Sequence, residues 1–364
     1  MKIAVLGGGN GSFAAAGELA LAGHAVRLWR RDAAAVAAHR AAGGGVVIED
    51  HRGRHEASLA LITNDIAAAV AGAELIVCPT PATAHADIAG ALAPHLQGGQ
   101  VVFLPPGSCG SLLFARAMRQ AGNRADAAFA ETGTLPWLTR KCGPFAATIT
   151  VRASRLPTGV LPLRRQAYAL AVIARAFPGS IEACGDVLSA ALLNAGPIIH
   201  PPLIVMNAAP LERLPSWDLH QEGTQATVRR VTDALDAERI AIREALGYAA
   251  PHFPLADHYA DAEGEEWMYG RGAHGKLTAS GNWREPISLS AHRYMREDVA
   301  IGLSLLVSVG ALAGVATPLA RAFLAIGSAI CGEDLLAGGR TLARLGVADL
   351  DAARLQAMLR EGMA

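Results

Sequence analysis

The sequence predicts an α/β domain with a doubly wound sheet in residues 1–185, followed by an all-α domain in residues 186–364. Three observations support this division. Short apolar runs alternate with alanine-rich helical stretches through the first half, which is typical of βαβ units and a parallel sheet. From about Asp186 the strand signals fade and longer helix-periodic segments follow. A chain of 364 residues also exceeds what one hydrophobic core usually serves.

The expected strands of the first domain are continuous apolar runs, as found where helices cover both faces of a parallel sheet. In α/β proteins, ligands bind at the edge where the carboxyl ends of such strands meet. Functional residues are therefore expected just after these strands. In chain order the strands are Ile3–Leu6, Ala25–Trp29, Leu59–Ile62, Glu74–Cys78, Gln100–Leu104, Ala127–Ala130 and Ala146–Val151.

The second domain is expected to be helical, because its apolar residues recur at helical spacing. The uncharged stretch Val299–Ala320 is long enough to span a bilayer. Because Pro318 interrupts it and a charged segment precedes it, buried helices are expected instead of a membrane span. The connection Pro251–Ser290 is rich in Gly, Pro, His and Trp. The predicted helices are Thr224–Leu246, Val299–Leu312 and Pro318–Cys331.

Charge and cysteine content narrow the class of protein. Lys plus Arg and Asp plus Glu both number 32, so there is no bias toward nucleic acid or anionic lipid. The five cysteines are widely spaced and lack a C-x-x-C pair, which argues against a disulfide framework and a zinc site. Met1 leads directly into a strand and not into a secretory signal. We expect a cytoplasmic, metal-free homodimer that acts on small molecules. The apolar helices of the second half either are buried within the subunit or form the dimer interface.

A glycine-rich loop follows the first strand and predicts a Rossmann-type dinucleotide-binding domain. Its glycines allow a tight turn and a close approach of the backbone to a pyrophosphate, which would lie at the N-terminus of the next helix. Ser12 replaces the last glycine of the usual pattern, and it is small enough for close helix packing. The alternative is a glycine turn without a ligand. The expected cofactor residues of this loop are Gly7, Gly9, Asn10, Gly11, Ser12 and Phe13.

Two arginines, Arg30 and Arg31, follow the second strand at the position that selects between the two nicotinamide cofactors. An acidic residue there binds the ribose hydroxyls of NAD, whereas arginine accommodates the 2′-phosphate of NADP. The sequence therefore favours NADP. NAD remains the alternative if Asp32 acts as the acidic residue, and solvated surface arginines are the structural alternative.

Two motifs in the second domain carry a family resemblance. The pattern N-x-x-P-x-x-H runs from Asn194 to His200, and the pattern R-Y-x-x-E-D runs from Arg293 to Asp298. With the glycine loop, they resemble the signatures of the octopine/nopaline dehydrogenase family, the opine dehydrogenases. The resemblance extends over nearly the whole chain and includes two further segments, Glu131–Trp137 and Gly339–Leu342.

The resemblance implies that an α-keto acid condenses with the amino group of an amino acid and that hydride from NAD(P)H reduces the imine. His200 would be the acid/base and Asp298 its partner. The residue types suit this chemistry, because a histidine exchanges protons near neutral pH and a carboxylate on its other ring nitrogen fixes the tautomer. The structural alternative is a core histidine that a neighbouring carbonyl satisfies.

The resemblance also implies roles for five other residues. Asn194 would line the nicotinamide side of the site. Arg293 would bind the cofactor pyrophosphate or a substrate carboxylate, since a guanidinium matches paired oxygens; a surface ion pair is its alternative. Glu131 would hold the amino donor and Thr132 the carboxylate of the keto acid. Thr80 would contact the cofactor, and an ordinary loop threonine is the slightly weaker alternative.

Two other functions fit the same plan. The first is an NADP-dependent reductase of a small 2-oxo acid or of a polyol phosphate. Enzymes of that kind use a catalytic lysine on the helical domain, and the second half contains only Lys276, within the connection. The second is a nucleotide-binding sensor without catalysis, against which the presence of both His200 and Asp298 in their motifs argues.

Overall fold

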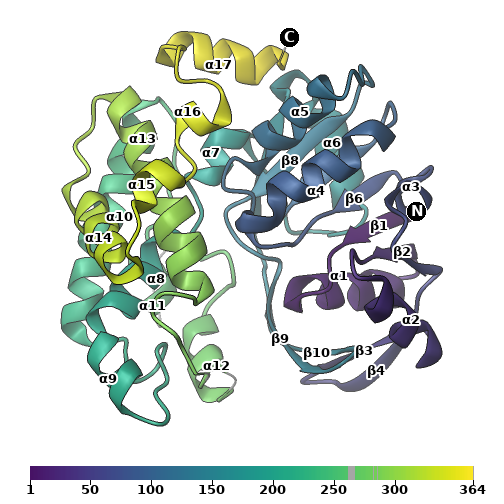
Figure 1. The fold of residues 1–364 in the computed structure, drawn as a ribbon, viewed down its shortest axis with the longest axis horizontal. Coiled ribbons are helices and arrows are strands. Elements are labelled where there is room, and N and C mark those ends of the chain that lie inside the picture. The colour runs from purple at the N-terminus through teal and green to yellow at the C-terminus, as the bar shows by residue number, and fades with distance from the viewer. Residues whose placement is uncertain (261–266, 282, 285, 364) are drawn as a thin grey trace. The chain divides into compact units, whose positions relative to one another are not determined.

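The structure is a computed structural model, and it describes residues 1–260, 267–281, 283–284 and 286–363. The chain forms two compact units (Figure 1). The division falls after Ala191, a few residues beyond the boundary expected at 185/186. The first unit comprises Met1–Thr80, Ala84–Ala191 and the residues from Leu359 onward, and the second comprises Pro81–Thr83 and Leu192–Met358.

The first unit is built on an eight-stranded sheet in the order β12-β11-β8-β7-β6-β1-β2-β5. All neighbouring strands are parallel except β8 and β11, which are antiparallel. The predicted α/β fold class is thus confirmed, with one antiparallel pair added. The strands are β1 (Lys2–Leu6), β2 (Ala25–Trp29), β5 (Leu61–Thr63), β6 (Leu75–Val77), β7 (Val101–Leu104), β8 (Ala128–Thr132), β11 (Leu156–Leu161) and β12 (Ile181–Asp186).

The centre of this sheet is fully buried, and its topology marks a binding edge. Every residue of β6 and β7 is buried, as expected for parallel strands with both faces covered. Strand β1 lies between β2 and β6, so the chain builds the sheet outward on both sides of β1. Doubly wound sheets bind ligands outside the carboxyl ends of strands at such a point. Gly7 follows β1 directly and Thr80 closely follows β6.

Helices connect the strands of this unit, and α4 packs against α5 beside the sheet (Figure 1). The α-helices are α1 (Asn10–Leu21), α2 (Ala33–Ala41), α3 (Ile66–Val70), α4 (His85–Leu92), α5 (Gly110–Gln120), α6 (Gln166–Ala174) and α7 (Val187–Ala191). Three short 3-10 turns are η1 (Ala82–Ala84), η2 (Ala93–His95) and η3 (Leu163–Arg165).

A second, four-stranded sheet in the order β4-β3-β10-β9 belongs to the same unit. The prediction that Ala146–Val151 joins the parallel sheet is wrong, because this stretch forms β10 of the second sheet. Its residues alternate between partly exposed and buried, as in a sheet with one covered face. The strands are β3 (Gly45–Asp50), β4 (Gly53–Ser58), β9 (Trp137–Gly143) and β10 (Ala146–Arg152).

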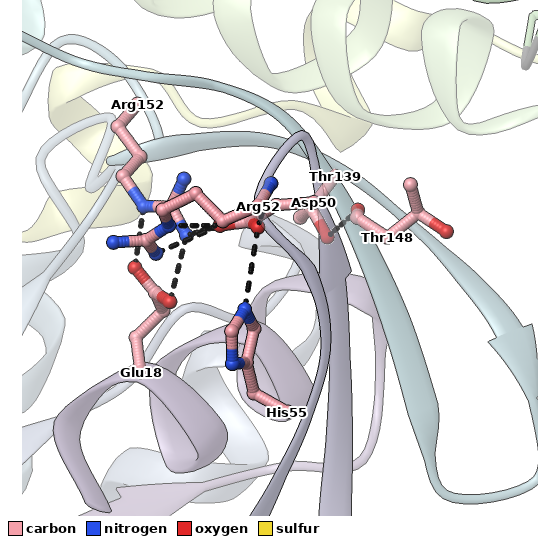
Figure 2. A network of polar contacts seen from close by, with 7 residues as sticks. All are labelled: Glu18, Asp50, Arg52, His55, Thr139, Thr148 and Arg152. Atoms are coloured by element: carbon pink, nitrogen blue, oxygen red, sulfur yellow. Dashed lines mark hydrogen bonds and ion pairs between the residues drawn. The ribbon is translucent and has the colours of Figure 1, made fainter. Parts of the chain in front are cut away.

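An ion-pair network ties α1 to the second sheet (Figure 2). The Arg152 guanidinium donates to both oxygens of Glu18, at 2.6 and 2.8 Å, and to Asp50 Oδ2 at 2.6 Å. Arg52 donates to the same Asp50 oxygen at 2.7 Å. Burial alone would raise the pKa of Asp50, but the hydrogen bonds from Arg52 and Arg152 outweigh it and hold this pKa well below its usual range. The network therefore fixes the cofactor-loop helix against β3 and β10.

In the described part of the second unit, every regular element is a helix. The predicted helix Pro318–Cys331 is confirmed as α14, and Thr224–Leu246 corresponds to α10. Val299–Leu312 is divided between a π-helical segment, η4, and α13, which the sequence does not indicate. The helices are α8 (Gly196–Met206), α9 (Ala208–Arg213), α10 (Ala226–Ala245), α11 (Ala256–Tyr259), α12 (Ala273–Ala279), η4 (Tyr294–Leu303), α13 (Ser304–Ala313), α14 (Pro318–Cys331), α15 (Leu335–Gly338), α16 (Leu342–Leu345) and α17 (Ala352–Glu361).

The long helix α10 organises this unit through buried charges. The Glu238 carboxylate accepts the N–H groups of Leu319 and Ala320, at 2.7 and 3.1 Å, and so caps the start of α14. Arg239 pairs with Asp236 one turn earlier, at 2.5 Å. All three charged residues are buried, and each has a partner, as buried charges require.

The apolar stretches of this chain are mostly buried. Val299–Ala320 includes the end of η4 and all of α13, and six of its ten Val, Leu and Ile side chains are buried. A different stretch, Val187–Met206, is long and apolar enough to cross a membrane by length and composition alone. Because 78% of its most apolar window is buried inside the protein, we interpret it as core. Residues 261–266, 282 and 285 of the expected connection lie outside the described residues.

Candidate active site

The glycine loop after β1 brings three of the predicted cofactor residues together. Gly7 has a φ of +113°, a conformation that side-chain-bearing residues rarely adopt. A Cβ atom at Gly7 would lie 2.6 Å from Ser12 Oγ and 2.7 Å from Thr80 Cγ2. Ser12 donates in turn to Leu6 O at 3.3 Å. Thr80 therefore packs against the glycine turn, as expected for a residue at the end of the neighbouring strand.

The start of α1 fits a pyrophosphate. No side chain caps Gly9, the residue before the helix, and no atom lies within 4 Å of where its Cβ would be. Within the described chain, the N–H groups of the first turn, from Asn10 to Ser12, have no hydrogen-bond acceptor. Such amides and the helix dipole attract an anion. The Phe13 side chain is an exception among the predicted loop residues, since it is completely buried in the core.

Two of the three charged residues after β2 have partners that limit their role. The Asp32 carboxylate caps α2 by accepting the N–H groups of Ala34 and Ala35, at 2.9 and 3.2 Å. Arg31 is exposed and pairs with Asp87 at 3.2 Å. Arg30 lies against the glycine loop, where a Cβ at Gly8 would be 2.8 Å from its Nε. Of the two predicted arginines, the structure thus places Arg30 at the loop and directs Arg31 away toward α4.

Glu131 and Thr132 at the end of β8 are both fully buried. The Glu131 carboxylate accepts the N–H groups of Cys109 and Ser111, at 2.7 and 3.1 Å, and the Ser111 hydroxyl at 2.8 Å. It therefore stabilises the start of α5. The Thr132 hydroxyl donates to Thr134 O at 2.6 Å. Both side chains thus have structural partners within the α/β unit.

In the helical unit, the two motif residues with the predicted acid/base role are in direct contact. His200 Nδ1, on α8, lies 2.7 Å from Asp298 Oδ2, on η4. The side chains of His200 and Asp298 are only 14% and 7% exposed, so water screens this pair weakly. Gly196 makes the approach possible, because a Cβ there would overlap Asp298 Oδ1. The same helix pair approaches closely at Gly302, whose Cβ would overlap Pro197.

Aromatic residues hold the His200 ring in place. The Tyr294 ring stacks on it with a centroid distance of 3.7 Å and an interplanar angle of 10°. The Tyr294 hydroxyl is hydrogen-bonded to His220 Nε2 at 3.0 Å, and His220 contacts the Trp283 ring edge-on. Because Tyr294 and Asp298 are four residues apart on η4, one helical segment supplies both the stacking ring and the carboxylate.

The electrostatics of η4 favour proton exchange near neutral pH. Burial raises the pKa of Asp298 to about 7, against the opposing effect of the positive charges of Arg293 and His292. Burial, together with the charge of Asp298, also raises the pKa of Glu297 to about 7. The Glu297 carboxylate accepts the Ala82 N–H at 2.7 Å. Perturbed carboxyl groups of this kind are characteristic of functional sites.

The two other predicted residues of this unit border the His200–Asp298 pair. Asn194 is nearly buried, and its Oδ1 accepts the Gly196 N–H at 3.0 Å, which starts α8. Arg293 is exposed, with its Cζ 4.9 Å from the centroid of the Tyr294 ring. The structure therefore brings together His200, Asp298, Arg293 and Asn194 in the helical unit.

Comparisons with known proteins identify the family. A family model described as NAD/NADP octopine/nopaline dehydrogenase, alpha-helical domain, matches residues 183–331. An opine dehydrogenase of Arthrobacter sp. (strain 1C) is 31% identical over 359 residues, which cover 97% of this chain and 97% of that relative. The chain belongs to the opine dehydrogenase family. This protein, like the other members of the family, is an NAD(P)-dependent oxidoreductase that acts on the CH–NH group of its donor.

Solved structures support the same fold. Octopine dehydrogenase with NADH and L-arginine has a TM-score of 0.75 and 18% identity, and the match covers 100% of this chain and 99% of that chain. Yersinopine dehydrogenase with NADP⁺ bound has a TM-score of 0.67 and 16% identity, covering 99% and 98%. The predicted combination of a Rossmann-type domain and a helical domain is therefore confirmed for this opine dehydrogenase family member.

Sequence reasoning missed three residues around the His200–Asp298 pair of this opine dehydrogenase. Tyr294 lies inside a recognised motif, and its four-residue spacing from Asp298 indicates a shared helix face. Glu297 adjoins Asp298, but nothing in the sequence indicates that its carboxylate binds the backbone of Ala82. His220 follows no motif and reaches Tyr294 only through the tertiary fold.

Proposed function

We propose that this opine dehydrogenase uses NADPH to join an α-keto acid of the pyruvate class to the amino group of an amino acid. The keto acid and amine condense to an imine with loss of water, and two electrons and two protons then convert the C=N bond to a secondary amine. The product is an N-(carboxyalkyl) amino acid. The 2.7 Å contact between His200 and Asp298, within the shared family motifs, carries this proposal.

The chain's own residues supply the proton chemistry. When bound, the nicotinamide cofactor provides the hydride that adds to the imine carbon. His200 removes a proton from the amino donor as the imine forms and returns one to nitrogen or to the leaving hydroxyl. Asp298 engages Nδ1, so we assign proton exchange with the substrate to Nε2. Asp298 also stabilises the imidazolium that forms while His200 holds the proton.

Arg293 is proposed to hold a carboxylate during this reaction. Its guanidinium lies above the Tyr294 ring next to the acid/base pair. A planar fork of N–H donors matches the two oxygens of a carboxylate, and both substrates of an opine synthesis carry one. Binding through this arginine would orient the keto acid or imine relative to His200.

The preference for NADPH over NADH is the finer part of the proposal. Arg30 lies beside the glycine loop, whereas the Asp32 carboxylate already caps α2. The acidic residue that would favour NAD thus has another role, and a cation is present where a 2′-phosphate is expected. The solved relatives include one with NADH and one with NADP⁺, so cofactor choice varies on this fold.

We also propose that the enzyme works in the cytoplasm as a homodimer with metal-free chemistry. Among the described residues, no group of three or more His, Cys, Asp or Glu side chains forms a metal site.

Several large apolar side chains of the helical unit, including Met206, Leu214 and Ile326, are 40% exposed or more and could contribute to a subunit interface. Size-exclusion chromatography with light scattering gives the mass, and a monomer at micromolar concentration would contradict the dimer.

The reaction is tested by following NADPH oxidation with a panel of amino acids and amines against pyruvate, glyoxylate and 2-oxoglutarate. We expect oxidation only when an amine and a keto acid are both present, with a product whose mass equals that of the imine plus two hydrogens. Oxidation by a keto acid alone would instead identify a simple 2-oxo acid reductase. Absence of turnover with every pair, in protein that binds NADPH, would favour a sensor.

A further inference from the structure

Two cations from distant parts of the chain cover the same aromatic ring in the α/β unit. Lys141 Nζ lies 4.9 Å from the centroid of the Phe13 ring, and Arg30 Cζ lies 5.6 Å from it. Lys141 is on β9, near the tip of the β9–β10 hairpin, and Arg30 directly follows β2. Phe13 itself is on the first turn of α1, immediately after the glycine loop. The fold therefore brings both cations to the edge of that loop.

Specific contacts hold each cation in place. Asn10 Oδ1, at the start of α1, accepts the Lys141 N–H at 3.0 Å and so fastens the hairpin to the glycine loop. Arg30 Nη1 donates to Ala35 O at 3.1 Å. Beneath them, the His39 and Phe145 rings stack at 4.1 Å with an interplanar angle of 4°. The position of Lys141 is thus set by an interaction with a residue that the sequence assigns to cofactor binding.

The two cations lack a negative partner within the described chain. Neither Arg30 nor Lys141 forms an ion pair there with a carboxylate, whereas Arg31 pairs with Asp87 and Arg152 pairs with Glu18. Burial and the nearby positive charge of Arg30 both lower the pKa of Lys141. Two like charges held side by side without a counterion form a site that an anion would stabilise.

The position of this pair identifies the anion. In a dinucleotide-binding domain the pyrophosphate lies at the start of the first helix and the adenosine ribose lies at the end of the second strand. Arg30 occupies the end of the second strand, and Lys141 joins it from a hairpin that the usual fingerprint does not include. An anion that reaches both cations would extend from the ribose and not from the pyrophosphate.

We propose that Lys141 and Arg30 together bind the 2′-phosphate of NADPH, so that a residue of the β9–β10 hairpin helps determine cofactor choice. The inference rests on the NADPH preference proposed above and adds the second ligand of the phosphate. Arg30 would provide paired N–H donors, and Lys141 a compact point charge on the opposite side of the phosphate.

The test is isothermal titration of the full-length protein with NADPH, NADH, adenosine 2′,5′-bisphosphate and AMP. The variant Lys141→Met keeps an unbranched apolar stem over Phe13 and removes only the charge. We expect it to weaken binding of NADPH and of the bisphosphate by about tenfold or more, as for loss of a charged hydrogen bond. Binding of NADH and AMP should change by less than about twofold.

Three further variants complete the design. Arg30→Met should weaken the same two ligands, and Lys141→Arg, which retains the charge, should preserve the preference for NADPH. Arg31→Gln is the matched control, because Arg31 is adjacent in sequence but pairs with Asp87, and it should leave all four affinities unchanged. Thermal unfolding of each variant without ligand checks that the fold is intact.

The outcomes separate this inference from the proposed function. If Lys141→Met retains the wild-type ratio of the NADPH and NADH affinities, or weakens both ligands equally, Lys141 only covers Phe13 and the inference is wrong. If wild-type protein binds NADH more tightly than NADPH, both the cofactor preference and the inference are overturned. If the protein binds NADPH more tightly than NADH but forms no opine, the proposed reaction is wrong. The assignment of Lys141 and Arg30 to the 2′-phosphate is then unaffected.

Discussion

At the residue scale, the contact between His200 and Asp298 decides how the histidine can act. A carboxylate at 2.7 Å from Nδ1 keeps that nitrogen as the partner of Asp298. In the proposed mechanism only Nε2 then exchanges protons with the reacting nitrogen or oxygen, because the two ring nitrogens cannot exchange roles without breaking the pair. In that mechanism Asp298 positions the proposed base and also compensates the positive charge of the imidazolium.

His200→Ala should lower kcat/KM for imine reduction by about 10²–10⁴-fold, the usual contribution of a general acid/base. NADPH affinity should stay within about twofold, because the predicted cofactor loop belongs to the other unit. Stopped-flow reduction rates and a direct binding titration measure the two effects. A variant with normal turnover would remove His200 from the mechanism.

Tyr294 should act as a positioning residue through its stack on His200. Tyr294→Phe keeps the ring and removes the hydroxyl that bonds to His220, so its activity should stay close to wild type. Tyr294→Leu loses the stack and should lower kcat by about fivefold to tenfold. An aromatic face also stabilises a cation, so the Tyr294 ring favours the protonated form of His200. In the pH–rate profile of Tyr294→Leu, the decline in activity that accompanies deprotonation of His200 should therefore occur at lower pH. A pH–rate profile that keeps its position would leave the ring with a packing role only.

The residues of the candidate site were predictable to the extent that motifs carry them. The family resemblance of two motifs in the second domain implies that His200 and Asp298 form a pair, and the structure brings them into contact. The ring that stacks on His200 and the histidine behind that ring were not predicted, since both contacts depend on helix packing. For Glu131, the sequence predicts a role in holding the amino donor but does not reveal a structural role. Its carboxylate accepts the N–H groups of Cys109 and Ser111.

At the scale of elements, the π-helical segment η4 concentrates the unusual electrostatics of the helical unit. It carries two consecutive acids, Glu297 and Asp298, both with a raised pKa. One acid contacts His200, and the other binds the backbone of Ala82, in the short segment Pro81–Thr83 that belongs to this unit. π-helical segments are rare and are frequently found at functional sites. Here the segment directs adjacent residues to different partners.

Glu297→Gln should make the protein more stable at pH 8 and leave its stability unchanged near pH 4. Burial raises the pKa of Glu297 from 4.5 to about 7, so the folded state binds the proton more tightly than the unfolded state does. Wild-type stability therefore falls as pH rises from about 4.5 to about 7, and glutamine avoids this loss. The gain at pH 8 has a ceiling on the order of 3 kcal/mol, and partial exposure of Glu297 reduces it.

Urea denaturation at several pH values measures this effect. The control is Glu212→Gln, since Glu212 is exposed on α9 and should show no such dependence. A Glu297→Gln variant that is less stable than wild type at pH 8 would mean that the ionised carboxylate stabilises the fold through Ala82 and Arg340.

Sequence analysis recognised buried parallel strands better than the polar edge strand of the second sheet. Six of the seven expected strands lie in the main sheet with ends shifted by at most two residues, because buried parallel strands are continuous apolar runs. Strand β4, with the sequence Gly-Arg-His-Glu-Ala-Ser, is mostly polar and gives no such signal. Ala146–Val151 was recognised as a strand, but its apolar pattern did not reveal which sheet it joins. Pairing depends on distant partners, here β3 and β9.

At the scale of the whole molecule, the chain consists of two units with separate cores. The change from strands to helices predicted both fold classes, an α/β part followed by a helical part. The assignment of Pro81–Thr83 and of the C-terminal residues could not be predicted, because each depends on contacts between positions far apart in sequence. Arg340 and Glu297, for example, both bind the backbone of Ala82, from positions more than 200 residues away.

NADPH at 100 times its Kd should raise the free energy of opening of the α/β core by about 2.7 kcal/mol. Units with their own cores open separately, so slow amides of β1, β6 and β7 should gain this protection while those of α10 and α14 should not. Hydrogen–deuterium exchange with mass spectrometry resolves the two sets. Equal protection in both would show that the chain opens as one cooperative unit.

The return of the chain to the first unit determines how the nucleotide-binding half could be produced on its own. The α/β unit ends after Ala191 in sequence order, but the residues from Leu359 onward also belong to it, and Arg164 donates to Glu361 O at 3.2 Å. In sequence order the helical unit is therefore an insertion within the α/β unit and not a C-terminal addition to it. A gene truncated at residue 191 would discard part of the nucleotide-binding half, whereas a fusion of Ala191 to Leu359 through a flexible linker would retain it.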